Sequence, residues 1–275
     1  MRKSISDSQS HTGGYWDTII ERPDGRDHED LWRAHLQGIY EDLIDRWGAC
    51  SRDGLILKTD LYDEAVSQYN LLPLCADKSE RVIGTDVSFE VAAAATRRML
   101  RTWHGWQNAV CTDVRQLPFR SNSFDVIISN STLDHFSRKE SILDGLREIH
   151  RSLKPGGSLL ITLDNPSNPV IFLRNAMPYR LLKSSKLIPF YMGVTLSKSR
   201  LVRVLKACGF RVRESMAIVH SPRILAIWTG HLLNRKKNVK IEEYVKRMLR
   251  MCERLEKLPT RYLTGYYVAA IATKR

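Results

Sequence analysis

The chain has 275 residues, of which 43% are hydrophobic, and it carries a formal net charge of +13. This length and apolar content are those of a folded domain with a substantial core, and they exclude a disordered chain. No apolar run approaches the length that a membrane-spanning helix needs, and residues 1–14 lack the apolar core of a signal peptide, so a cytoplasmic location is expected.

The first fifty residues are predicted to form a helical extension. Residues 1–30 contain Gly13-Gly14 and Pro23-Asp24-Gly25, which are turn-forming pairs, and should be loose and polar. Apolar residues then recur at helical spacing from Asp30 to Trp47. We therefore expect one helix in the extension, at 30–47, and a domain boundary near residue 50.

Short apolar strands alternate with helices from residue 51 to 165. The expected strands are 54–60, 81–86, 108–111, 124–129 and 158–163, and the expected helices are 61–76, 89–100 and 141–153, the last ended by a turn at 154–157. Continuous apolar strands that alternate with helices are typical of a parallel sheet covered on both faces. The sequence therefore predicts an α/β fold for this half of the domain.

The alternation becomes irregular after Pro166. The expected elements are a helix at 197–208, a strand at 211–220, helical stretches at 222–234 and 240–257, and a last strand at 266–273. Residues 166–275 should form the substrate-side half. Its insertions, 166–196 and 222–257, carry many apolar side chains and are expected either to cap the core or to cover a hydrophobic acceptor.

Polar side chains stand where four of the predicted strands end. These are Asp60, Asp86, Asp113, and the pair Asn130 and Ser131. Ligands of open α/β sheets bind at the carboxyl ends of the strands, near the point where the strand order reverses. An acid after the second strand could accept both hydroxyls of a ribose, and one after the third could accept an exocyclic amine.

Three stretches carry a family resemblance. They are Asp113 to Phe136 with its Leu-Pro-Phe and Phe-Asp pieces, Leu146 to Ile161 with Leu-Lys-Pro-Gly-Gly, and Val82 to Ser88. Together they resemble class I S-adenosylmethionine-dependent methyltransferases, in particular the small-molecule group that includes the ubiquinone and menaquinone enzymes. The resemblance implies a Rossmann-like sheet of seven mostly parallel strands with the last one reversed, and helices on both faces.

The resemblance also implies S-adenosylmethionine as the cofactor. The matching cofactor positions are Asp86, Val87, Phe89, Asp113, Val114, Asn130 and Ser131. By this likeness Asp86 would hold the ribose, Asp113 would recognise adenine together with the Val114 backbone, and Phe89 would pack on the adenine. Asn130 and Ser131 would line the floor near the sulfonium.

The first cofactor loop departs from the family. The family has an acid and a Gly-x-Gly-x-Gly loop, whereas this chain has no glycine from Leu57 to Ala65. In one interpretation a variant loop still binds the cofactor, with its ammonium on Asp60, Asp63 or Glu64 and its carboxylate on Lys58 or Thr59. In the other, the loop has lost the cofactor and the chain is a catalytically silent binding protein.

Methyl transfer needs a base only when the acceptor must lose a proton. His135, just after the fourth strand, is the first candidate, and His220, at the end of the sixth, is the second. A structural role is also open for each histidine. The favoured acceptor is a small or lipid-like organic molecule that is methylated at oxygen or carbon.

The positive charge is concentrated late in the chain. From Arg174 onward there are 23 Lys and Arg residues against 5 Asp and Glu residues. Such a surplus indicates either a solvated basic surface or an anionic partner, such as an acidic substrate, a membrane surface or nucleic acid. RNA methylation is less favoured, because Asn130-Ser131-Thr132-Leu133 does not resemble the N-methylating motif. The five scattered cysteines include no C-x-x-C pair, so neither a disulfide framework nor a metal site is predicted.

Overall fold

The computed structural model of the chain describes most of the domain. The described residues are 13–20, 30–48, 54–69, 71, 81–102, 106–178, 181–182, 191–223, 226, 229 and 239–275. Parts of the expected insertions, namely 179–180, 183–190 and most of 224–238, lie outside the described residues. So does the second half of the helix expected at 61–76.

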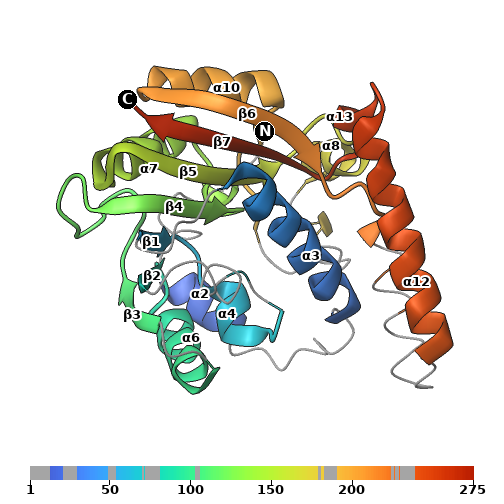
Figure 1. Ribbon diagram of the computed structural model, residues 1–275, viewed down its shortest axis with the longest axis horizontal. Coiled ribbons are helices and arrows are strands. Elements are labelled where there is room, and N and C mark those ends of the chain that lie inside the picture. The colour runs from blue at the N-terminus through green and yellow to red at the C-terminus, as the bar shows by residue number, and fades with distance from the viewer. Residues whose placement is uncertain are drawn as a thin grey trace.

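The described residues form a seven-stranded sheet in the order β3-β2-β1-β4-β5-β7-β6 (Figure 1). The strands are β1 Leu55–Lys58, β2 Arg81–Asp86, β3 Trp106–Cys111, β4 Phe124–Asn130, β5 Leu153–Asp164, β6 Phe210–Ile218 and β7 Tyr267–Lys274. The pairs from β3 to β5 are parallel, and β7 runs antiparallel to both β5 and β6. This topology confirms the predicted Rossmann-like sheet with a reversed last strand.

Helices cover both faces of the sheet. They are α2 Gly13–Ile20, α3 Asp30–Trp47, α4 Tyr62–Val66, α6 Phe89–Thr102, η2 Leu133–His135, α7 Lys139–Ser152, α8 Pro169–Ala176, α10 Lys198–Ala207, α12 Val239–Cys252, η3 Glu253–Lys257 and α13 Arg261–Thr264. Apolar residues of α3, α6 and α12 pack on one face, and those of α7 and α10 on the other. Because successive side chains of a strand point to opposite faces, Ile56 and Leu57 belong to the two hydrophobic cores on opposite faces of the sheet. No helix in the described part of the chain is long and apolar enough to cross a bilayer.

The helix α2 was not expected. The sequence predicted a loose segment around Gly13-Gly14, yet a helix begins at Gly13. Its buried residues are Trp16 and Ile19, and it packs beside α6, where Asp17 accepts hydrogen bonds from the Ser88 hydroxyl and the Glu90 amide. Tertiary contacts therefore outweigh the weak helix propensity of the two glycines.

Two of the strand boundaries that differ from expectation have a clear local cause. The turn predicted at 154–157 lies inside β5, where the pairing register with β4 shifts between Phe124 and Val126. Gly156 adopts a positive φ of 78° there, so the predicted turn is present as a local irregularity within the strand. The strand expected to reach His220 stops at Ile218, because Val219 adopts a φ of 62° that a strand does not allow.

Candidate functional site

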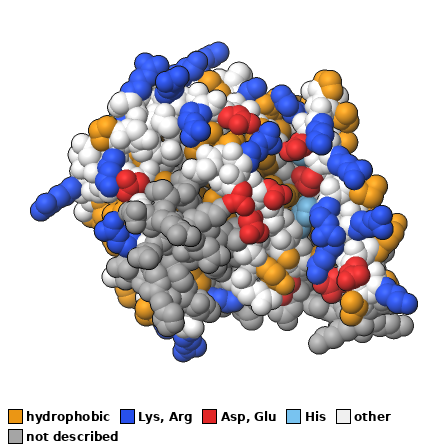
Figure 2. Space-filling view, in the orientation of Figure 1, with side chains coloured by type: hydrophobic (Ala, Val, Ile, Leu, Met, Phe, Trp, Pro, Cys, Tyr) orange, Lys and Arg blue, Asp and Glu red, His pale blue; other side chains and the backbone are white. Residues whose placement is uncertain are grey.

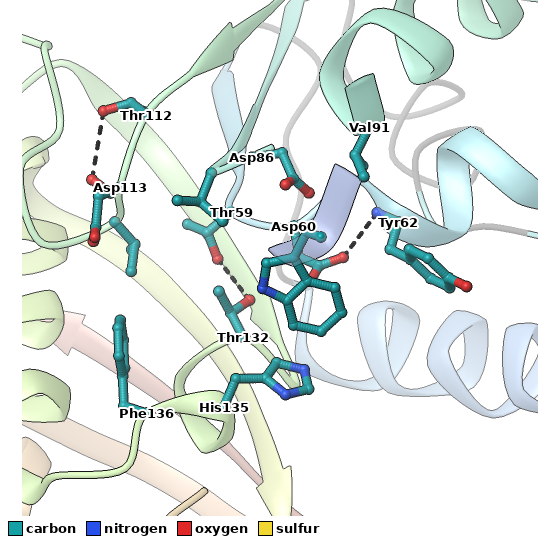
Figure 3. Close-up of a pocket in the computed structure, with 13 residues that line it drawn as sticks. Thr59, Asp60, Tyr62, Asp86, Val91, Thr112, Asp113, Thr132, His135 and Phe136 are labelled. Atoms are coloured by element: carbon teal, nitrogen blue, oxygen red, sulfur yellow. Dashed lines mark hydrogen bonds between the residues drawn. The ribbon is translucent and has the colours of Figure 1, made fainter. Parts of the chain in front are cut away.

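A cleft lies at the carboxyl ends of β3, β2, β1 and β4 (Figure 3), where the strand order reverses. The free interior of the cleft is about 50 Å³, which is small beside the roughly 300–1,000 Å³ usual for small-ligand sites. Its lining residues are Trp16, Thr59, Asp60, Tyr62, Asp86, Val87, Val91, Thr112, Asp113, Val114, Thr132, His135 and Phe136. Seven of the residues predicted from the sequence are among them: Thr59, Asp60, Asp86, Val87, Asp113, Val114 and His135.

Asp86 is the most deeply buried of the three aspartates that line the cleft. One carboxylate oxygen accepts the Leu61 amide at 3.0 Å, and the other accepts the Ser88 amide at 2.8 Å. The side chain is almost completely buried, and this burial, followed by the nearby charge of Asp60, raises the pKa of Asp86 to about 7. A carboxylate oxygen can accept more than one hydrogen bond, so Asp86 retains acceptor capacity for a ligand with hydroxyl groups.

Lys58 and Glu64 form an ion pair beneath the loop that follows β1. The Lys58 Nζ lies 2.7 Å from a Glu64 carboxylate oxygen, and neither side chain is exposed to solvent. Lys58 also donates to the Asp60 carbonyl, so one ammonium group holds both ends of the loop. Burial alone would lower the pKa of Lys58, but the carboxylates of Glu64 and Asp60 outweigh it and raise that pKa. Neither Lys58 nor Glu64 lines the cleft.

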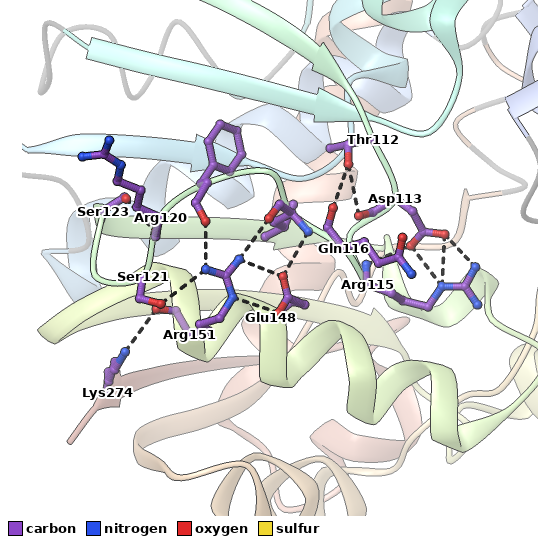
Figure 4. Close-up of polar contacts among 12 residues, drawn as sticks. Thr112, Asp113, Arg115, Gln116, Arg120, Ser121, Ser123, Glu148, Arg151 and Lys274 are labelled. Carbon is purple, nitrogen blue, oxygen red and sulfur yellow. Dashed lines mark hydrogen bonds and ion pairs between the residues drawn. The ribbon is translucent and has the colours of Figure 1, made fainter.

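Asp113 is held by an arginine two residues away. Arg115 places its guanidinium against both carboxylate oxygens, with Nη2 2.6 Å from Oδ2 (Figure 4). The guanidinium also lies over the Phe136 ring, 5.0 Å from the ring centroid. The Arg115 amide donates to the same carboxylate at 2.8 Å. These contacts fix the orientation of Asp113 at one end of the cleft.

The loop after β3 is fastened to α7 (Figure 4). Arg151 donates to the carbonyls of Leu117 and Phe119, and its partner Glu148 accepts the Leu117 amide at 3.1 Å. The Leu-Pro-Phe piece therefore serves to hold the wall that carries Asp113 and Val114.

His135 stands at the inner end of the cleft. Its Nδ1 lies 3.0 Å from the Tyr191 carbonyl, which can only accept, so Nδ1 carries the proton and Nε2 is the basic nitrogen. The Trp16 ring packs edge-on against the imidazole at 4.8 Å between ring centroids. His135 is thus oriented and has the tautomer that a proton acceptor needs.

His220 lies in a different cluster and does not line the cleft. Its Nε2 lies 3.2 Å from the Ala217 carbonyl, and its Nδ1 lies 2.7 Å from the Thr264 hydroxyl. Burial lowers the pKa of this histidine. Both ring nitrogens have protein partners, which fits a structural role.

The other predicted residues lie outside the cleft lining. Asp63 is on α4, and Phe89, at the start of α6, is 65% exposed. Asn130 Oδ1 and Ser131 Oγ are buried at the end of β4 and have no hydrogen-bond partner among the described residues.

Sequence reasoning missed several lining residues. They are Trp16, Tyr62, Val91, Thr112, Thr132 and Phe136. The aromatic pair Tyr15-Trp16 with Ile19-Ile20, at helical spacing, was the available signal for α2.

A second acidic group lies behind η2. Asp134 is fully buried and accepts the Asp164 amide at 3.0 Å, while Asp164 pairs with Arg174 at 2.6 Å. Burial and the charge of Asp164 raise the pKa of Asp134 to about 6. The backbone carbonyl of Asp134 accepts the Gly193 amide. This hydrogen bond holds the segment whose Tyr191 carbonyl contacts His135.

Comparison with known proteins relates the chain to methyltransferases. Residues 66–161 match the family of methyltransferase domains. The chain is 26% identical to the demethylmenaquinone methyltransferase of Chlorobaculum parvum over 164 residues, which is 54% of this chain and 64% of that protein. It is 44% identical to the probable tRNA methyltransferase 9B of Mus musculus over 57 residues, 21% of this chain but only 12% of that protein.

The fold has many solved counterparts. One is the geranyl diphosphate C-methyltransferase of Streptomyces coelicolor A3(2), solved with Mg²⁺, geranyl diphosphate and S-adenosyl-L-homocysteine. The TM-score is 0.56 at 15% identity, and the match covers 94% of this chain and 88% of that one. At this identity the likeness concerns the fold.

The ion pair under the first loop gives a stability prediction. Lys58→Met leaves the Glu64 carboxylate buried without a counter-charge and should lower the free energy of unfolding by about 3–5 kcal/mol. The double variant Lys58→Met/Glu64→Leu removes both charges and should lose much less. Urea unfolding followed by circular dichroism measures both, and equal losses in the single and double variants would contradict the coupling.

Proposed function

Because the chain carries a class I, S-adenosylmethionine-dependent methyltransferase domain, we propose that it transfers a methyl group to a small or lipid-like organic acceptor, at oxygen or carbon. The observation that carries the proposal is the buried Asp86 carboxylate in a cleft at the strand switch point. The glycine-free loop had left a catalytically silent protein as the alternative. The Lys58–Glu64 pair argues against it, because this pair gives the loop a defined shape without glycine.

The residues of the cleft fit the cofactor. Asp86 would accept from the ribose hydroxyls, Asp113 and the Val114 backbone would meet the adenine, and Asp60 with Thr59 would face the methionine part. Asn130 and Ser131 lie outside the cleft lining, at the end of β4, and their buried side-chain oxygens have no partner among the described residues. By the family resemblance they would lie near the sulfonium. When bound, S-adenosylmethionine supplies a methyl group made electrophilic by its sulfonium.

The protein's own contribution is alignment and the exclusion of water. Trp16 and Phe136 give the cleft apolar walls beside His135, so an acceptor there would be shielded from solvent. His135 Nε2 would take the proton of an acceptor hydroxyl, while the Tyr191 carbonyl holds Nδ1–H and keeps the ring in place. An acceptor that is already ionised would not need this step.

A first prediction concerns cofactor affinity. Asp86→Ala removes charge-assisted hydrogen bonds and should weaken S-adenosylmethionine binding by about 2–4 kcal/mol, or at least thirtyfold. Asp63→Ala removes the same charge from α4 outside the cleft lining, and should bind within about threefold of the wild type. Calorimetric titration measures both. Absence of binding to the folded wild-type protein would overturn the proposed function.

A second prediction concerns pH. Asp86 in the free protein has a raised pKa of about 7, whereas its carboxylate is the form that accepts from ribose and faces a cationic ligand. Affinity should therefore fall as the pH drops from about 8 to 6, and binding at pH 7 should release a fraction of a proton. Titrations in buffers of different ionisation enthalpy measure this release. Asp60→Asn should shift the transition to lower pH, because it removes the charge beside Asp86.

A third prediction separates the two histidines. In a screen that detects S-adenosylhomocysteine, His135→Gln should lower kcat about a hundredfold for phenols, which must lose a proton. The same variant should change kcat much less for hydrophobic carboxylic acids, which are ionised already. His220→Gln serves as the control and should retain kcat for both classes. An equal loss for phenols and acids in the His135 variant would contradict a role as proton acceptor.

A further inference from the structure

The outermost helix of the domain buries little of its surface. Helix α12 packs beside α3 and stands at the margin of the molecule (Figure 1). Only Val245 and Leu249 are buried, four residues apart on one side. Lys240, Tyr244, Arg247 and Met251 follow at intervals of four and three residues, so they form one outward stripe. The helix therefore presents a continuous face to solvent.

The exposed residues from 239 to 263, which we name the α12 surface, are strongly basic. The basic ones are Lys240, Arg247, Arg250, Arg254, Lys257 and Arg261, and Glu243 is the acidic one in this range. The segment also holds three partly buried acids: Glu242 pairs with Lys246, Glu256 lies 3.9 Å from Arg46, and Glu253 accepts the His220 and Ser221 amides. Residues 239–263 thus hold seven Lys and Arg residues against four Glu residues, so a net positive charge remains.

Large apolar side chains are interleaved with these charges. They are Val239, Ile241, Tyr244, Met251, Leu258 and Leu263, each at least 46% exposed. Figure 2 shows blue basic and orange apolar side chains alternating along the edge where Figure 1 draws α12. Exposed apolar side chains gathered in one region indicate an interaction site, and an interfacial helix combines such side chains with a basic rim.

We propose that the α12 surface docks on an anionic lipid surface. The basic side chains would meet the phosphate head groups, and Tyr244 and Met251 would enter the boundary between head groups and acyl chains. The phosphates of RNA would pair with the basic side chains but would leave the aliphatic side chains exposed to water. The lipid surface is therefore the occupant that both features favour. This inference does not depend on methyl transfer, and its test uses no methylation assay.

The test is co-sedimentation of the whole chain with vesicles. The protein should bind vesicles of phosphatidylcholine mixed with phosphatidylglycerol, and not vesicles of phosphatidylcholine alone. Arg247→Gln/Arg250→Gln should weaken binding at least about tenfold, since each charge near such a surface contributes about a fivefold gain. Tyr244→Ser/Met251→Ser should remove the binding that persists at high salt, where charge attraction is screened.

Helix α10 provides the matched control. It exposes Arg200 and Arg203 but none of the exposed large apolar side chains found in the described part of the chain. Arg200→Gln/Arg203→Gln should bind vesicles within about twofold of the wild type, and thermal unfolding verifies that every variant is folded. Absence of binding to anionic vesicles, or an equal loss in the α10 variant, would overturn the proposal. The proposal would also be overturned if Arg247 and Arg250 were required for binding to transfer RNA but not for binding to vesicles.

Discussion

The buried carboxylate of Asp86 is the contact around which the cleft is arranged. Its two oxygens accept one amide from the loop after β1 and one from the start of α6, so three neighbouring segments converge on one side chain. Ser88 in turn bonds Asp17 of α2, which brings Trp16 to the cleft. A group that both organises the cleft and faces the ligand is held in place before the ligand arrives.

Much of the sheet could be predicted from the sequence, since buried parallel strands are apolar throughout and end on polar residues. Asp60, Asp86 and Asp113 were identified by that pattern alone, and all three reach the cleft. Parallel strands bring their carboxyl ends to one edge, so residues far apart in the chain meet without any further signal. His135 follows the same logic, because it comes shortly after β4.

The remainder depended on contacts that no local pattern contains. Helix α2 begins with two glycines, and contacts with α6, His135 and Tyr191 stabilise it. Phe89, predicted to pack on the adenine, is 65% exposed at the start of α6 and does not line the cleft. Lys58 and Glu64 were both interpreted as ligand contacts. Their pairing could not be deduced from the sequence, because a lysine and a glutamate six residues apart are common in polar loops. Only the folded loop brings the two side chains together.

The ion pair beneath the first loop also constrains how such a site can evolve. A glycine loop can gain or lose side chains one at a time, but here each partner is tolerable only while the other is present. A change from the ion-paired loop to a glycine loop, one residue at a time, would leave a buried charge without its partner. Only a simultaneous change of both residues avoids that intermediate. The effects of the two residues are therefore epistatic. Relatives of this chain should therefore carry both residues or neither.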